Sequence, residues 1–163
     1  MRTDFETSGD IRDVDLLAAF VDFWRRRTSG AISFSRAAAS AAFGLARGEV
    51  ASVSSSEARF ESSAILVRAG KLDGAALERL SIPEGTDGAL AALQTGILTK
   101  REWRWGEKIR GIEILADLLA WPDGKYYFDG FLFGTHFGSA KLDAWFGITM
   151  PALAVGLFTV SVK

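Results

Sequence analysis

The stretch Phe43–Ser56 (FGLARGEVASVSSS) combines glycines with several serines, the residue types of a phosphate-binding loop or of a serine nucleophile. A Walker-type phosphate loop also needs Lys followed by Ser or Thr before a helix, and this pair is missing. A serine nucleophile needs a base and a Gly-x-Ser-x-Gly elbow. The stretch has no such elbow, and the only histidine of the chain is His136. The remaining interpretation, which we favour, is a β-hairpin that turns at Arg47 and Gly48.

Other side chains for catalysis or metal binding are scarce. The chain has no cysteine and one histidine, which excludes disulfides, thiolate metal sites and any pair of histidine ligands. His136 lies among phenylalanines without an acidic neighbour in the sequence, which favours a core or surface histidine over a catalytic base. The carboxylates Asp117, Asp123 and Asp129 are spaced like those of turns and solvated helix faces. We therefore predict no enzyme, no metal site and no cofactor.

Three consecutive arginines, Arg25–Arg27, could bind phosphate or RNA. They also end a predicted helix over residues 10–27, where the negative end of the helix dipole favours positive charge, and Asp10 can cap its start. The chain has 19 basic and 20 acidic residues, so no global field favours nucleic acid or an anionic membrane. We predict a solvated helix end, with a phosphate or RNA site as the less favoured alternative, and expect no nucleic-acid partner.

Hydrophobic periodicity predicts the elements that position these side chains. We expect an α+β fold with a small antiparallel sheet from about residues 30–35, 41–54 and 124–129. The first helix and a long helix before Trp121 are expected to cover this sheet. The apolar stripe predicted for the first helix is Ile11, Val14, Leu17, Val21 and Trp24.

Two helical corners are predicted in the middle of the chain. Each has a helix, a glycine stop, a capping residue and the start of the next helix. Gly70 and Gly96 suit the left-handed position after a helix end, and Thr99 with Glu102 forms a capping box.

The long helix is predicted over residues 102–121, with Gly106 and Gly111 allowing a bend. Its interleaved Trp and Arg residues could stack bases or bind a partner, but an amphipathic helix with its aromatics inside is the interpretation we favour. Its predicted stripe is Trp105, Ile109, Ile112, Leu115 and Leu119.

At 163 residues, with 48% hydrophobic and 24% charged residues, the chain is predicted to be one packed globular domain, 1–163. Residues 10–60 and 104–130 would form its helix-and-sheet core. Residues 61–103 would be an inserted helical subdomain, and residues 131–163 an apolar C-terminal extension.

The two ends of the chain give different indications about localisation. The N-terminus is polar and acidic without a secretory pattern, which favours a cytoplasmic protein. No charged residue occurs from Ala144 to Val162, but Gly147, Pro151 and Gly156 interrupt this run. A membrane-spanning helix is therefore less favoured than a buried helix or an interface, and membrane contact through 144–162 stays an alternative.

The order of these elements resembles the PATAN-type domain, a bacterial module found beside receiver domains. The resemblance covers about Ile11 to Phe128, and its strongest match is the turn Trp121–Gly124 (WPDG) leading into an aromatic strand; the hairpin around Gly48 is second. Gly70 and Gly96 mark the helical corners in the same series. The resemblance implies a noncatalytic protein-interaction module in signalling, in some bacteria linked to motility or type IV pilus control. It carries over no catalytic residue, and we expect no receiver domain within these 163 residues.

We therefore expect a noncatalytic adaptor or scaffold that presents a surface to a protein partner. Trp103, Arg104 and Trp145 are the candidate partner-binding anchors, because they lie off the main helical stripe or in the apolar segment. Ordinary core packing is the competing explanation for them. The alternative function is a membrane-peripheral or accessory subunit, possible as an oligomer, attached through the apolar C-terminal segment.

Overall fold

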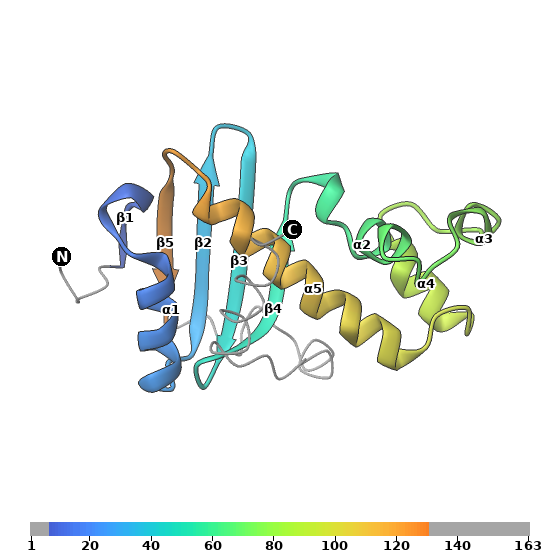
Figure 1. The fold of residues 1–163 in the computed structure, drawn as a ribbon, viewed down its shortest axis with the longest axis horizontal. Helices are drawn as coiled ribbons and strands as arrows, with labels where there is room; N and C mark the ends of the chain where they lie inside the picture. The colour runs from blue at the N-terminus through green and yellow to red at the C-terminus, as the bar shows by residue number, and fades with distance from the viewer. Residues whose placement is uncertain (1–6, 131–163) are drawn as a thin grey trace.

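The computed structural model describes residues 7–130, which form a five-stranded antiparallel sheet with helices α1 and α5 on one face (Figure 1). This confirms the predicted α+β class. The strand order is β1-β5-β2-β3-β4. The strands are β1 (Ser8–Asp10), β2 (Gly30–Arg36), β3 (Ala39–Ala46), β4 (Glu49–Ser55) and β5 (Lys125–Asp129). The helices are η1 (Ile11–Asp13), α1 (Leu16–Arg25), η2 (Ala58–Phe60), α2 (Ser62–Arg68), α3 (Gly74–Glu78), α4 (Gly88–Gln94) and α5 (Lys100–Leu119).

The main core lies between the sheet and these two helices. Strand residues alternate between the two faces of a sheet, and the large apolar side chains of the central strands all point toward the helices. The Phe20 ring of α1 meets Phe43 of β3 edge-on, with 5.3 Å between ring centroids. The strand side chains of this core include Ile32, Phe34, Phe43, Leu45, Val50 and Val53, all nearly inaccessible to solvent.

The predicted first helix is wrong in its start, and its buried stripe is only partly correct. Residues 8–10 pair with β5 as strand β1, and the Asp10 carboxylate accepts a hydrogen bond from the Arg12 backbone at the start of η1. Helix α1 begins only after Asp15, whose carboxylate accepts from Ala18 N. Of the predicted stripe, Ile11 is buried and Val14 and Leu17 pack against the core, but Val21 and Trp24 are exposed. The buried residues of α1 itself are Leu16, Ala19, Phe20 and Phe23.

The predicted hairpin is confirmed. Strands β3 and β4 pair antiparallel and are joined by Arg47 and Gly48, whose φ angles are +52° and +81°. Two consecutive positive φ angles are the signature of the mirror-image turn that matches the twist of a hairpin. The serines of the opening stretch are therefore strand and loop residues.

The helical corners are also confirmed, and they form a small core of their own. Gly70 and Gly96 have φ of +68° and +78° after α2 and α4. Thr99 N and Oγ1 donate to the Glu102 carboxylate at 3.0 and 2.7 Å, and these hydrogen bonds lower the pKa of Glu102. The core of this part consists of Leu66, Leu72, Ala89, Ala92 and Leu98.

Helix α5 is continuous and connects the two parts of the molecule. Of its predicted stripe, Ile112 and Leu115 are buried, but Trp105 and Leu119 are 39% and 42% exposed. A Cβ on Gly106 would lie 2.7 Å from the Leu66 side chain, so this glycine allows α2 to approach α5 closely. Close packing between helices, rather than a bend, explains the glycine.

The turn from Trp121 to Gly124 leads into β5, as predicted. The apolar extension 131–163, with His136, Trp145 and the uncharged run, lies outside the described residues.

Candidate anion-binding site

The end of α1 and the β3–β4 turn are fixed against each other. Gly48 N donates to Thr28 O at 2.7 Å, and Arg47 N donates to Ser29 Oγ at 2.9 Å. A Cβ on Gly48 would lie 2.5 Å from Trp24 Cα, closer than real contacts allow. Glycine is therefore required both by the positive φ and by the approach of the two backbones.

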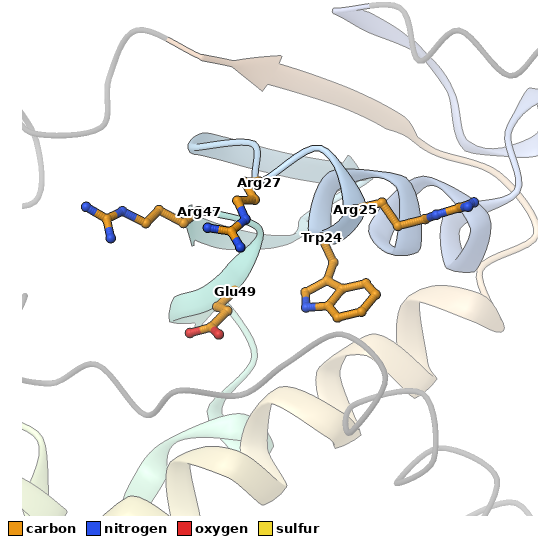
Figure 2. A pocket seen from close by; sticks show the side chains of 5 residues that line it. All are labelled: Trp24, Arg25, Arg27, Arg47 and Glu49. Carbon is orange, nitrogen blue, oxygen red and sulfur yellow. The ribbon is translucent and has the colours of Figure 1, made fainter.

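This junction brings together three arginines and a tryptophan from two elements. They line an open hollow of about 570 Å³ together with Glu49, and we call this set (Trp24, Arg25, Arg27, Arg47 and Glu49) the arginine pocket. Figure 2 shows the Arg25 and Arg47 side chains extending in opposite directions, with Trp24 and Arg27 between them. The positive groups are thus spread along the hollow instead of converging on one point.

The arginines of the pocket keep their hydrogen-bond donors available. Within residues 7–130, Arg25, Arg27 and Arg47 form no side-chain hydrogen bond or ion pair, whereas the neighbouring Arg26 pairs with Asp22 at 2.8 Å. All three guanidinium groups are exposed, and Glu49 is the only carboxylate among the described lining residues. A guanidinium presents parallel N–H donors that match a carboxylate or phosphate. The pocket is therefore suited to bind an anionic group.

Two of these arginines occupy strained backbone positions. Arg27 and Arg47 both have φ of +52°, a conformation that costs a non-glycine residue about 1–2 kcal/mol. The left-handed position before Gly48 usually carries Asn, Asp or Gly. Ala37, in the β2–β3 turn, has φ of +48° as well, so strain alone does not mark a site. At Arg27 and Arg47, however, the residue in the strained conformation carries a charged side chain that lines the hollow, and this supports a role in binding.

A second polar cluster is buried and has a structural role. Glu107 of α5 accepts hydrogen bonds from Ser62 Oγ and from Arg110 Nη1, the latter at 3.3 Å. Arg110 also donates to Phe60 O at 2.6 Å and to Val53 O at 3.0 Å. Each of these side chains has a partner, and no fully buried side-chain nitrogen or oxygen of the described residues lacks one. The cluster therefore joins α5 to β4 and to the start of α2.

The carboxylates weighed as catalytic candidates are held in separate structural contacts. Asp117 accepts from Trp121 Nε1 at 3.0 Å and from Arg59 Nη2 at 2.7 Å, while Asp123 accepts from Arg36 Nε at 3.0 Å. Asp129 ends β5, opposite Ala31. In the part of the chain that is described, no group of three His, Cys, Asp or Glu side chains is arranged to hold a metal ion.

The predicted anchors do not meet at the arginine pocket. Trp103 is half-buried against the small core of the helical corners, and Arg104 is exposed beside it on α5. Both lie at the start of α5, on the opposite side of the molecule from the end of α1 (Figure 1). Trp145 lies outside the described residues.

Sequence reasoning missed the combination of Trp24, Arg47 and Glu49 with the arginine run. Trp24 was assigned to the buried stripe, and Arg47 was interpreted only as a turn residue. The available signal was the arginine at a turn position that normally favours Asn, Asp or Gly.

The comparisons with protein-family models, curated proteins and solved structures give no match. Among residues 7–130, no helix has both the length and the apolar character needed to cross a membrane.

Proposed function

We propose that this chain is a noncatalytic protein-interaction module that binds an acidic segment of a partner protein in the arginine pocket. The single observation that carries the proposal is the set of three exposed arginines that have no ion-pair partner among residues 7–130, beside an exposed tryptophan. Trp24 is 39% exposed although it is large and apolar. An aromatic side chain next to arginines is typical of the anchors of protein interfaces.

The spread of the charges favours an extended acidic segment over a single small anion. A tightly bound phosphate needs several donors that converge on it, whereas Arg25 and Arg47 extend in opposite directions (Figure 2). An acidic chain can place successive carboxylates along such a hollow.

The surroundings of the pocket argue against nucleic acid. The chain carries a formal net charge of −1, and Glu49 lies in the hollow itself. Binding to nucleic acid depends on neutralising many phosphates along its backbone. Three local arginines beside a carboxylate provide too small a basic surface for that.

The resemblance to PATAN-type domains supports a place for this module in bacterial signalling or motility control, in the cytoplasm. Such a module would act by bringing its partner to an assembly, without turnover. Trp103 and Arg104 would then belong to a separate surface of the helical corners.

The test is the affinity of the full chain for a fluorescein-labelled octaglutamate peptide, measured by fluorescence anisotropy. The double variant Arg27→Gln/Arg47→Gln should weaken binding at least about tenfold, because each charge-assisted hydrogen bond contributes on the order of 1 kcal/mol. Increasing salt should weaken binding of the unaltered protein as well.

The matched control is Lys100→Gln/Arg101→Gln, which removes the same charge from exposed residues at the start of α5. This variant should bind the peptide as the unaltered protein does. Equal weakening by both double variants would show that only net charge matters, and the pocket would then have no specific role. A labelled octathymidine that binds more tightly than octaglutamate would contradict the choice of a protein partner.

A further inference from the structure

The sheet has a second face that none of the described helices covers. In β2, β3 and β4 the large apolar residues point toward α1 and α5, so the alternate residues point to the other side. Those alternate residues are small, and we call this surface the outer face. Its central residues are Ala31, Ser33, Ser35, Ala42, Gly44 and Ser54.

The outer face is hollow and carries little charge. A depression of about 450 Å³ lies over it, lined by Ser33, Ala42, Ser54 and the side of Tyr127, among others. Tyr127 is 53% exposed there. An antiparallel sheet can leave one face in water, but such faces usually carry long polar side chains. Among the described residues, the charge at the β1–β5 edge of this face comes from Lys125 and Asp129 of β5 and from Asp10 of β1, which pairs with Lys125, while its centre over β2 and β3 consists of small uncharged residues.

The chain that follows the sheet has the complementary character. Residues 131–163 include six large aromatic side chains, and no charged residue occurs from Ala144 to Val162. Exposing such a segment to water costs about 25 cal/mol for each Å² of apolar surface. The segment therefore needs a cover, and the outer face offers small side chains against which bulky ones can pack closely.

The C-terminal segment starts next to the outer face and is long enough to cover it. The segment follows β5, which lies inside the sheet between β1 and β2. The last residue of β5, Asp129, pairs with Ala31 of the outer face. The opposite face of the sheet is already filled by α1 and α5. A helix over 144–162 would be about 28 Å long, and a seven-residue strand such as β2 spans about 23 Å. The segment can therefore cross the whole sheet.

We propose that residues 131–163 pack on the outer face of the sheet of the same chain, where their aromatic side chains fill the depression over Ser33, Ala42 and Ser54. The occupant is the chain's own C-terminal segment, so the fold would have three layers: helices, sheet and this cover. The proposal does not depend on the arginine pocket.

The absence of cysteine from the chain allows a clean cross-linking test. Ser33→Cys is combined, in the full chain, with one cysteine in the segment: Ala144→Cys, Thr149→Cys, Ala154→Cys or Ser161→Cys. A short bismaleimide is added to dilute protein, and links within one chain are separated from covalent dimers by mass. The control replaces Ser33→Cys by Ser81→Cys, an exposed residue between α3 and α4.

At least one segment position should link within the chain about tenfold more with Ser33→Cys than with Ser81→Cys. Ser54→Cys, on β4, repeats the measurement should the Ser33 variant fold poorly. Covalent dimers in place of internal links would assign the outer face to a second copy and overturn the proposal. Equal yields of internal links with Ser33→Cys and Ser81→Cys would also overturn the proposal, because the segment would then have no fixed place on the sheet. A higher yield with Ser33→Cys that disappears when phosphatidylglycerol vesicles are added would overturn it too, because the segment would then prefer the membrane.

Discussion

The two ends of the sheet both carry arginines, but they use them differently. At the β2–β3 end, which we call the paired end, the arginines are bound to carboxylates: Arg36 to Asp123 at 3.0 Å, and Arg59 to Asp117 at 2.7 Å. At the β3–β4 end, which we call the arginine end, Arg25, Arg27 and Arg47 have no such partner within residues 7–130. Both ends have an open hollow and a non-glycine residue with positive φ.

The difference separates charge used for the fold from charge left for a partner. At the paired end, ion pairs connect segments that are distant in the sequence, as Lys125 and Asp10 also show at 3.3 Å. At the arginine end, the same connecting role is taken by backbone hydrogen bonds and by the close approach of Gly48 to α1. Within the described part of the chain, the arginine side chains there make no contact that holds this end together, so their guanidinium groups can bind a partner.

The largest effect is expected where the arginine end is held by close packing. Gly48→Ala should destabilise the protein by about 3 kcal/mol or more, because its Cβ meets backbone atoms of α1 at 2.5 and 2.7 Å and its φ is +81°. Gly70→Ala is the matched control. It has φ of +68° but nothing within 4 Å, so it should cost only about 1 kcal/mol.

Urea denaturation of the full chain measures both variants. A similar loss of unfolding free energy in the two would show that only the backbone angle matters. The arginine end would then not depend on contact between Gly48 and α1.

A smaller effect should distinguish the two strained turns. Arg47→Asn and Ala37→Asn each place a residue that tolerates positive φ at a position with φ of +52° or +48°. Both should raise the free energy of unfolding by up to about 1 kcal/mol. Only Arg47→Asn should weaken octaglutamate binding, by about fivefold, because Ala37 lies at the paired end.

Thermal unfolding and anisotropy on the same samples give the two readouts. Equal affinities for the two variants would remove Arg47 from the binding site. A loss of stability in Arg47→Asn would mean that its side chain supports the fold, against the contrast drawn between the two ends.

The sequence predicted the features that depend on neighbouring residues and missed those that depend on distant ones. The turn at Gly48, the stops at Gly70 and Gly96 and the capping box of Thr99 depend on residues a few positions apart, and all are confirmed. Strand β1 was missed because it is short and depends on pairing with β5, at the other end of the described chain. The local pattern of apolar and polar residues does not indicate which distant strand will pair with it.

The buried face of α1 was only partly predicted and the site was missed, for related reasons. Two apolar patterns one residue apart are both present in α1, and only contact with the sheet selects the one that contains Phe20 and Phe23. Trp24 and Arg47 meet because a hairpin packs on a helix end. The sequence predicted each of these elements but not their contact.

The smallest effect concerns the paired end at low pH. Hydrogen bonds from the Arg12 side chain and backbone, and then from Lys125, hold the pKa of Asp10 well below its ordinary value. Because the folded pKa is lowered, this stabilisation is present above the unfolded pKa of about 4 and is lost as pH falls below it. Asp10→Asn removes the titrating group and should flatten the dependence of the urea midpoint on pH between about 4 and 2. Arg12→Gln removes the main cause of the shift and should flatten it in the same direction. An unchanged acid slope in both variants would show that the ion pairs of Asp10 do not stabilise the paired end.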